Sequence, residues 1–430
     1  MTVRLNSGDA DFQQALDALL TRKRDSDTDI RASVAAILSE VQARGDAALA
    51  DYSRRFDRLD LATVGLRVSA DAIDEAKSRV APKTLEALSL AADRIRAFHR
   101  QQRTPDRDYT DESGVRLGER WTPVAAAGLY VPGGLASYPS SVLMNALPAK
   151  VAGVERLVMT VPSPDGLLSP LVLAAAELAG VDEIYRVGGA QAVAALAYGT
   201  ETISPVDKIV GPGNAWVAEA KRQVFGCVGI DTIAGPSEIL VVADAGSNPA
   251  WVAADLLSQA EHDRSAQSVL ISDSADFADR VEAEIAIQLE TLPKADIARD
   301  SWQNHGVIII TDSLQAAVPV IDRIAPEHLE LCVEDPEPLM QAVRHAGAIF
   351  LGRYTPEAIG DYVAGTNHVL PTSRAARFSS GLSVYDFMKR TTFTGCTPES
   401  LALIGPAAII LAEEEGLAAH ARSVSVRLDS

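Results

Sequence analysis

Hydrophobic positions follow a helical spacing over the first hundred residues of the chain. In the segments 30–57 and 72–102, Ala, Ile, Leu and Val recur every three or four residues among charged side chains. This spacing places the apolar side chains on one face of a helix. We therefore expect residues 1 to about 105 to be mainly α-helical.

The pattern changes at about residue 122. Up to residue 237, short β-branched runs are each followed by a glycine-rich turn and an alanine-rich helical stretch. A second block of this kind, from 238 to 380, contains the runs EILVVADAG, SVLISDS, GVIIITDS and AGAIFLGRY. Strands that alternate with helices favour an α/β fold with two layers built on largely parallel sheets. From Ser383 the helical pattern returns, and it ends in a short β-like tail at 425–428.

The length and composition fit a multidomain globular protein. A chain of 430 residues exceeds one ordinary hydrophobic core, so we expect at least two domains. The apolar fraction of 47% and the charged fraction of 23% are typical of globular proteins and argue against a disordered or fibrous chain. The net charge of −19, without a basic run interleaved with aromatic residues, argues against a nucleic-acid partner.

The sequence also bears on location and on metal ligands. Residues 1–13 carry no apolar signal-peptide core, and no run approaches about eighteen apolar residues. We therefore expect a cytoplasmic protein without a membrane partner. Cys227, Cys332 and Cys396 lie far apart, which excludes a disulfide framework and a cysteine-based zinc knuckle. A metal would have to be bound by histidine, carboxylate or amide side chains.

Gln259 and His262 lie at the end of the apolar-periodic segment 249–262. If this segment is a helix, their spacing of three directs both side chains from one face at its carboxyl end. Imidazole nitrogen suits zinc, and an amide oxygen is an uncommon but acceptable further ligand. The alternative is a polar helix terminus at which His262 interacts favourably with the helix dipole.

Glu327 and His328 follow Pro326 in RIAPEHLEL, a sequence typical of the first turn of a helix. Adjacent side chains on a helix diverge by roughly 100°, so these two residues would address different steps at one reacting centre. Histidine is a natural general base near neutral pH, and a partly buried glutamate can exchange protons with water. The alternative is an acidic helix start with a surface histidine.

Two more pairs of an acid and a histidine lie further along the chain. Asp361 and His368 stand in a glycine-rich stretch that cannot be a long helix, and Glu415 and His420 flank Gly416. Each pair could equally belong to a solvated loop. The remaining histidines have no comparable neighbours, and we expect them at the surface; they are His99, His305 and His345.

No predicted strand is followed by the dinucleotide-binding fingerprint GxGxxG. Three other glycine turns follow strand-like runs, at VPGG after Tyr130, at VGGA before Gln191 and at VGPG before Asn214. Glycine lets the backbone approach a phosphate, and the start of the following helix favours negative charge. Tight strand-to-helix turns need glycine even without a ligand, so each turn alone is weak evidence.

Cys332 lies four residues beyond His328 and offers an alternative nucleophile, because a thiolate could capture an aldehyde. Its neighbours Leu331 and Val333 indicate a buried apolar strand, in which a thiol is inert. We therefore favour a structural role for this cysteine.

Eight motifs between about residue 120 and the end of the chain resemble, in order, those of the histidinol dehydrogenase family. They are AGLYVPGG, VGGAQAVAALAYGT, VGPGN, IDTIAGPSE, LLSQAEHD, APEHLEL, AGTNHVLPTS and EGLAAHARSV.

This resemblance implies a fold and a division into domains. The family's fold resembles that of aldehyde dehydrogenases, with two incomplete Rossmann-like domains, which accounts for the absent fingerprint. The implied segments are a helical N-terminal segment, a first α/β domain with the metal and catalytic residues, a second α/β domain with the NAD contacts, and a helical C-terminal segment exchanged between the subunits of a homodimer. Their ranges are 1–25, then 26–129 with 238–381, then 130–237, and finally 382–430.

The resemblance also implies site residues. One zinc ion per subunit would be bound by Gln259, His262, Asp361 and, across the dimer, His420. The acid–base residues would be Glu327 and His328. The substrate would contact the four zinc ligands and three further residues besides His328, and NAD would contact a separate set. These are Ser237, His368 and Glu415 for the substrate, and Tyr130, Gln191 and Asn214 for NAD.

The implied reaction is a four-electron oxidation of L-histidinol to L-histidine through L-histidinaldehyde, with two NAD reduced in turn. His328 would take the alcohol proton, Glu327 would activate water, and zinc would orient the imidazole and amine of the substrate. The nearest alternative is a related zinc dehydrogenase acting on another diol, such as a sulfonated propanediol. Glu415 and His368 argue against it, since a sulfonate calls for cationic residues. A metal hydrolase and an inactive NAD-binding or scaffold protein are further alternatives.

Overall fold

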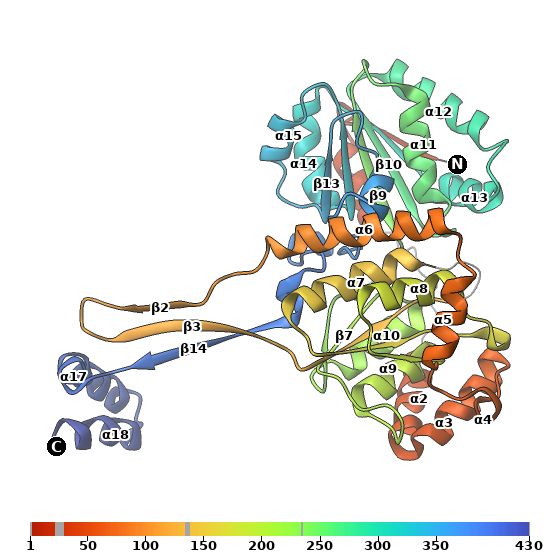
Figure 1. The fold of residues 1–430 in the computed structure, drawn as a ribbon. Helices are drawn as coiled ribbons and strands as arrows, with labels where there is room; N and C mark the ends of the chain where they lie inside the picture. The colour runs from red at the N-terminus through yellow and green to blue at the C-terminus, as the bar shows by residue number, and fades with distance from the viewer. Residues whose placement is uncertain (1, 22–29, 134–137, 234, 430) are drawn as a thin grey trace.

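Two α/β units and a long arm make up the protein (Figure 1). The computed structural model describes residues 2–21, 30–133, 138–233 and 235–429. One unit is built on a six-stranded sheet and the other on a five-stranded sheet, and the arm carries a separate three-stranded sheet. None of the helices in these ranges is both long and apolar enough to cross a lipid bilayer.

The six-stranded sheet is parallel throughout and has the order β1-β11-β10-β9-β12-β13. Its inner strands β9 to β12 are largely buried on both faces, as parallel sheets require when helices cover both sides, whereas the edge strand β1 is partly exposed. Ile239 and Val241 of β9 contribute to the core on one face, and Leu240 and Val242 to the core on the other. The strands are β1 (Val3–Asn6), β9 (Glu238–Ala243), β10 (Gln267–Ser272), β11 (Val307–Ile310), β12 (His328–Cys332) and β13 (Ala348–Leu351).

The five-stranded sheet is also parallel and has the order β6-β5-β4-β7-β8. Counted from its first strand, this order is 3-2-1-4-5, and the other sheet shows the same order from β9 onward, with β1 added at its edge. It is the strand order of the dinucleotide-binding Rossmann fold without the sixth strand. The expected α/β class with two incomplete Rossmann-like units is confirmed. The strands are β4 (Ala126–Tyr130), β5 (Arg156–Thr160), β6 (Glu183–Tyr185), β7 (Lys208–Val210) and β8 (Gly229–Ile230).

Helices cover both faces of each sheet. On the six-stranded sheet, one face is covered by α11 (Pro249–Ala260), α12 (Ala275–Gln288) and α13 (Ala295–His305), and the other by α1 (Phe12–Thr21), α14 (Leu314–Ile324) and α15 (Glu337–Ala342). On the five-stranded sheet, one core contains α5 (Ala70–Ser78), α6 (Pro82–Arg100), α7 (Pro139–Ala152) and α8 (Pro170–Ala179). The opposite core contains α2 (Arg31–Arg44), α3 (Asp46–Tyr52), α4 (Leu61–Val64), α9 (Gly189–Tyr198) and α10 (Ala215–Val224).

This packing groups the chain differently from the expected ranges. Helices α2 to α6, expected with the first α/β domain, pack against the five-stranded sheet. Strand β1, in the segment expected to be helical, extends the six-stranded sheet by pairing with β11. An amphipathic stripe shows that a helix is covered but not which sheet covers it, so sequence periodicity alone does not assign these helices. The expected boundary between residues 25 and 26 lies outside the described residues.

The arm consists of an antiparallel ribbon with two helices at its end (Figure 1). Its strands are β2 (Arg107–Thr110), β3 (Arg116–Pro123) and β14 (Met388–Gly395), and its helices are α17 (Pro398–Glu414) and α18 (Ala418–Leu428). The expected β-like tail at 425–428 is wrong, because these residues continue α18 as its last turn. Helix α18 packs beside helix α17.

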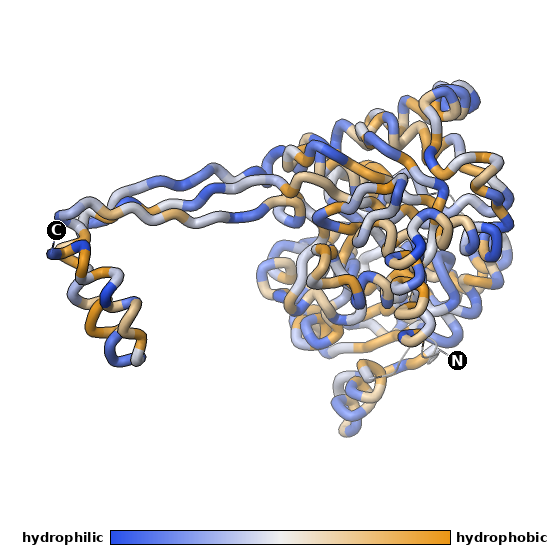
Figure 2. The backbone as a smooth tube through the Cα atoms, turned by 90° about the horizontal axis from the view of Figure 1, so that it is seen from below, coloured by the Kyte–Doolittle hydropathy of each residue, from blue (hydrophilic) through white to orange (hydrophobic). Residues whose placement is uncertain are grey.

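Apolar side chains remain exposed on the arm helices. Leu403 is 67% exposed and Leu411 64% exposed, and further examples are Ile404, Ile410, Leu417 and Val426. Figure 2 shows apolar positions along this part of the backbone, well away from the body of the molecule. Several exposed apolar side chains on one short segment are typical of a protein interface.

Candidate functional site

Glu327 and His328 lie at the amino end of strand β12, in the middle of the six-stranded sheet. The expected helix start at Pro326 is wrong. Helix α14 ends before it, with Ala325 in a left-handed conformation at φ 48°, and a residue that precedes proline avoids the α region. The chain then enters a strand that pairs with β9 and β13. Both side chains are buried, at 6% and 4% exposure.

The backbone N–H and carbonyl of one residue of strand β9, Glu238, orient both residues. The backbone N–H of Glu238 donates a hydrogen bond to Oε2 of Glu327 at 2.9 Å. The backbone carbonyl of the same residue lies 2.9 Å from Nδ1 of His328. A carbonyl can only accept, so Nδ1 of His328 carries the proton and Nε2 carries the lone pair. The side chain of Glu238 is anchored in turn, because its Oε1 accepts from the backbone N–H of Ser373 at 3.1 Å.

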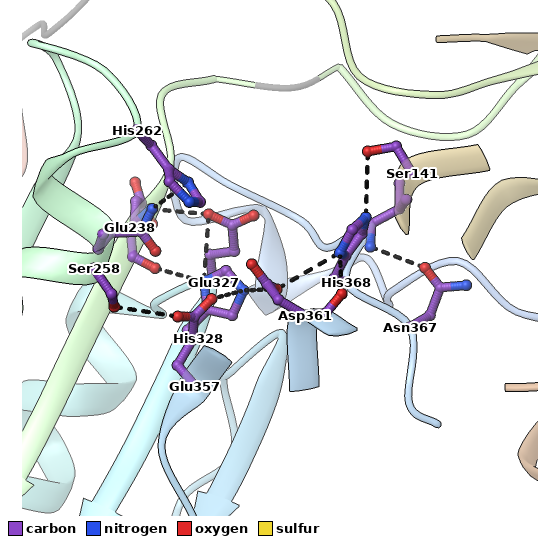
Figure 3. A network of polar contacts seen from close by, with 12 residues as sticks. Ser141, Glu238, Ser258, His262, Glu327, His328, Glu357, Asp361, Asn367 and His368 are labelled. Carbon is purple, nitrogen blue, oxygen red and sulfur yellow. Dashed lines mark hydrogen bonds and ion pairs between the residues drawn. The ribbon is translucent and has the colours of Figure 1, made fainter. Parts of the chain in front are cut away.

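The lone pair of His328 faces two carboxyl groups of helix α16 (Glu357–Tyr362). Nε2 of His328 lies 3.6 Å from Oε1 of Glu357 and 3.9 Å from Oδ1 of Asp361. These two acids are four residues apart on the helix and therefore share one face. Figure 3 shows the imidazole between them and the Glu327 carboxyl group.

Burial shifts the proton affinities in this cluster. The pKa of Glu327 is raised well above its ordinary value, mainly by burial and further by the nearby carboxylates of Glu238, Asp361 and Glu357. Burial lowers the pKa of His328, against the opposing effect of Asp361. Burial, together with Asp361, raises the pKa of Glu357 to about 9. A neutral imidazole beside protonatable carboxyl groups is suited to proton transfer near neutral pH.

Gln259 and His262 meet at the carboxyl end of α11, as their spacing predicts. Nε2 of Gln259 lies 3.2 Å from Nδ1 of His262. Gln259 is completely buried, and its Oε1 has no hydrogen-bond partner. Such an amide oxygen is costly in a protein interior unless something binds to it. A metal ion would satisfy it.

His368 reaches the same region from the loop after α16. Its Nδ1 donates to the backbone carbonyl of Asp361 at 3.1 Å, and its Nε2 lies 3.5 Å from Oγ of Ser141. Ser141 begins helix α7, which follows β4 of the five-stranded sheet. The carboxyl end of that sheet and the amino end of the six-stranded sheet therefore meet at this site (Figure 3). Ser237 directly precedes β9 on the same side.

Glu415 and His420 lie apart from all these residues. Both are exposed side chains, at the end of α17 and within α18 of the arm. The arm extends away from the body of its own chain (Figure 1), so a single chain does not bring them to the cluster around His328.

Tyr130, Gln191 and Asn214 gather at the carboxyl end of the five-stranded sheet. Tyr130 ends β4, and its hydroxyl accepts a hydrogen bond from the N–H of Gly189 at 3.1 Å, at the start of α9. Gln191 is buried in the first turn of this helix. Asn214 caps α10 by accepting from the N–H groups of Trp216 and Val217. In sheets of this strand order, ligands bind at the carboxyl ends of the strands where the order reverses.

Comparisons with known proteins identify the family. The family described as histidinol dehydrogenase matches residues 20–428. The histidinol dehydrogenase of Rhodospirillum rubrum is 65% identical over 430 residues, which cover 100% of this chain and 99% of the relative. That of Rhizobium meliloti is 61% identical over 429 residues, covering 100% of this chain and 99% of the relative. The chain belongs to the histidinol dehydrogenase family.

A solved histidinol dehydrogenase shares the whole architecture. The crystal structure of the enzyme from Elizabethkingia anophelis aligns with a TM-score of 0.95 at 36% identity and covers 100% of this chain and 98% of that one. An acetylating aldehyde dehydrogenase from Geobacillus thermoglucosidasius reaches a TM-score of only 0.47 at 14% identity, over 87% of this chain and 99% of that one. This score is too low to bear on the expected likeness to aldehyde dehydrogenases. The expected family and enzyme class are confirmed.

Two residues of this site, Glu238 and Glu357, are not among the candidates predicted from the sequence. Glu238 binds Glu327 and His328 through its backbone N–H and carbonyl. These partners lie 89 and 90 residues away along the chain, so no local sequence pattern identifies Glu238. Glu357 could have been found, because its spacing of four from Asp361 predicts a shared helix face.

Two expectations for other residues have different outcomes. His99 is fully buried, so its expected surface position is wrong; its ring contacts Gln102 and Asn367. Cys332 is buried in an apolar strand as expected. Burial raises the pKa of its thiol to about 12, which argues against a nucleophilic thiolate.

Proposed function

We propose that this protein oxidises L-histidinol to L-histidine in two NAD-linked steps through L-histidinaldehyde, with one zinc ion per subunit. The observation that carries the proposal is that the backbone N–H and carbonyl of Glu238 hold Glu327 and His328, which places a carboxyl group and a neutral imidazole close together. Family membership supports histidinol as the substrate and histidine biosynthesis as its context.

Zinc would be bound by Gln259, His262 and Asp361 of one chain and His420 of the partner subunit. The buried and unpartnered Oε1 of Gln259 supports this set, as does the contact between Gln259 and His262. One nitrogen from each imidazole and one oxygen from each of the other two side chains suit zinc. When bound, the ion would hold and orient the imidazole and amine of the substrate.

In the first oxidation, His328 takes the alcohol proton on Nε2 while a hydride leaves the carbinol carbon. Its pKa is lowered by burial, so the imidazole is neutral and ready to accept. In the second oxidation, Glu327 takes a proton from water as the water oxygen attacks the aldehyde carbon, and a base then takes a hydroxyl proton of the hydrate as its hydride leaves for NAD. Burial raises the pKa of Glu327, which makes its carboxylate a stronger proton acceptor.

NAD would accept the hydride in each step, with Tyr130, Gln191 and Asn214 as its contacts. Their position at the carboxyl end of the five-stranded sheet supports this assignment, because the strand order reverses between β4 and β7. The contact between Ser141 and His368 brings this edge close to the catalytic pair. The five-stranded unit would thus be the cofactor domain.

The active form would be a homodimer in which arms are exchanged. Glu415 and His420 would then reach the site of the partner, where they would contact the substrate and the zinc ion beside Ser237 and His368. The exposed apolar side chains of α17 and α18 support an interface on the arm.

A diol with a sulfonate group is a poorer substrate for this geometry. The side chains around His328 are carboxyl groups, namely Glu327, Glu357 and Asp361. They favour the cationic amine and the imidazole of histidinol over an anion.

The NADH yield tests this function. Zinc-loaded protein given limiting L-histidinol should form two NADH per substrate and release histidine. Turnover of a different diol, without NADH formation from histidinol, would refute the substrate assignment.

A further inference from the structure

His328, Glu357 and Asp361 form a compact set of ligand atoms next to the proposed zinc site. One ligand atom from each lies within 4.8 Å of the other two. The set shares only Asp361 with the zinc ligands proposed above. It combines an imidazole nitrogen with two carboxylate oxygens, the donor types that suit zinc and similar ions.

Two of these ligand atoms are buried and lack partners outside the set. Nε2 of His328 has no hydrogen bond although its residue is 4% exposed, and Oε1 of Glu357, at 2% exposure, has none outside the pair that Glu357 forms with Asp361. Nδ1 of His328 is engaged by the Glu238 carbonyl, so the lone pair on Nε2 can only point toward the two acids. Unpartnered buried acceptors are costly, and a cation among them would satisfy both atoms at once.

The charge of the surroundings also favours a cation. Glu327 adds a third carboxyl group, with its Oε2 at 3.7 Å from Nδ1 of His328. Among the described residues, no lysine or arginine forms an ion pair with Glu327, Glu357 or Asp361. No basic side chain of the described residues therefore compensates these acids, and a bound divalent ion could do so.

We propose that His328, Glu357 and Asp361 form a second, inhibitory site for a divalent cation of the zinc type. It rests on the function proposed above, in which His328 is the general base. An ion in the second site occupies the lone pair on Nε2 of His328, so that this atom can no longer receive the alcohol proton. Excess zinc therefore lowers kcat and leaves the affinity for NAD unchanged.

Metal counting by equilibrium dialysis tests the site independently of turnover. Protein that holds one zinc ion per subunit is titrated with Zn²⁺, and bound metal, NADH formation and NAD affinity are measured at each concentration. The wild type should take up a second ion in the concentration range that inhibits it. Glu357→Gln should keep the first ion and weaken binding of the second, and the inhibition, by the same factor of at least about tenfold.

Glu219→Gln provides the matched control, since Glu219 is a buried glutamate on α10 of the other unit. It should bind the second ion like the wild type. Uptake of only one ion by the wild type at saturating zinc would overturn the proposal. Loss of the first ion in Glu357→Gln would overturn it as well, by showing that this set is the primary site. Failure of the proposed function would appear separately, as absence of NADH from histidinol in protein that holds one ion.

Discussion

The backbone carbonyl of Glu238 accepts a hydrogen bond from Nδ1 of His328 at 2.9 Å. This contact fixes the imidazole tautomer across two neighbouring strands, so that Nε2 is the basic atom. The N–H group of the same residue binds Glu327. The backbone N–H and carbonyl of a single residue thus set the positions of both proposed proton acceptors.

The side chain of Glu238 anchors this stretch of backbone by accepting a hydrogen bond from the N–H of Ser373. Glu238→Ala should therefore lower kcat by roughly tenfold to a hundredfold, because small displacements of catalytic groups are costly. Glu238→Gln can still accept the hydrogen bond from the N–H of Ser373, so its kcat should fall much less. Steady-state kinetics of the two variants check this. Equal losses would show that the charge of Glu238, and not its anchoring contact, is what matters.

Glu327→Gln should separate the two oxidations. The amide cannot take a proton from water, so oxidation of the aldehyde should slow by roughly 10²–10⁴-fold. Alcohol oxidation depends on His328 and should be affected less. The NADH yield per histidinol in the early phase should fall from two toward one, with aldehyde trapped by an added amine reagent. An unchanged yield of two would contradict the role of Glu327.

Lys221 and Asp231 hold the turn that precedes Asn214. Nζ of Lys221 donates to the carbonyl of Gly211 at 3.0 Å, and Asp231 accepts from the N–H of the same residue at 2.8 Å. The two side chains also form a buried ion pair. Gly211 has a φ of 113°, and a side chain there would collide with the carbonyl of Tyr130.

Lys221→Met should leave Asp231 as an unpaired buried charge and cost about 3–5 kcal/mol of unfolding free energy. It should also raise the KM for NAD with little change in the KM for histidinol. Urea unfolding and kinetics measure both effects, with Lys221→Arg as a variant that keeps the charge. Arg222→Gln alters an exposed neighbour and serves as the control. A loss of stability with both KM values unchanged would limit the ion pair to a structural role.

The half-buried Asp255 and the buried Glu330 form a pair of carboxyl groups joined by a hydrogen bond. Burial raises the pKa of Asp255 from 3.8 to about 6 and the pKa of Glu330 well above 4.5. Because both pKa values are raised by folding, the folded chain binds these protons more tightly than the unfolded chain. The stability from this pair is complete below about pH 4 and declines as the pH rises through the folded pKa values.

Glu330→Gln mimics the protonated acid and should flatten this decline. Between about pH 5 and about pH 8, the variant should lose roughly 1–3 kcal/mol less unfolding free energy than the wild type. Urea unfolding at the two pH values measures the difference, with the exposed Glu334→Gln as control. Parallel losses in the wild type and in Glu330→Gln would show that the pair does not cause the pH dependence.

Exchange of the arms predicts complementation between two inactive variants. His420→Ala lacks the ligand that a chain would contribute to the site of its partner. His262→Ala lacks a ligand that a chain would contribute to its own site. In a mixed dimer, one of the two sites regains every proposed ligand, so mixing the unfolded subunits and refolding them should restore part of the activity. The separately refolded variants are the control. Absence of any recovery would indicate that each chain completes its own site.

The fold follows from the sequence wherever burial is strong. Parallel strands such as β9 and β10 are continuous apolar runs, and glycine turns separate them from their helices. The ribbon of the arm is different. Strands β2 and β14 are mostly exposed and polar, so they have no apolar alternation and depend on pairing with β3. Local pattern therefore misses the arm sheet.

The candidate site can likewise be predicted from the sequence only in part. Gln259 and His262 are close in sequence, and their helical spacing predicts their contact. The surroundings of His328 come from β9, β12 and α16, which tertiary structure alone brings together. His99 appears as an isolated surface residue in the sequence because its partner Asn367 lies 268 residues away. Contacts between residues so far apart in the sequence cannot be recognised from a short stretch of the chain.

The position of the arm has a practical consequence for fusion proteins. In the proposed dimer, anything attached after α18 would be carried toward the catalytic cluster of the neighbouring chain. Strand β1 lies at the outer edge of the six-stranded sheet, far along the chain from the arm. Purification tags, fluorescent reporters and surface-immobilisation handles are therefore better placed before β1 than after α18.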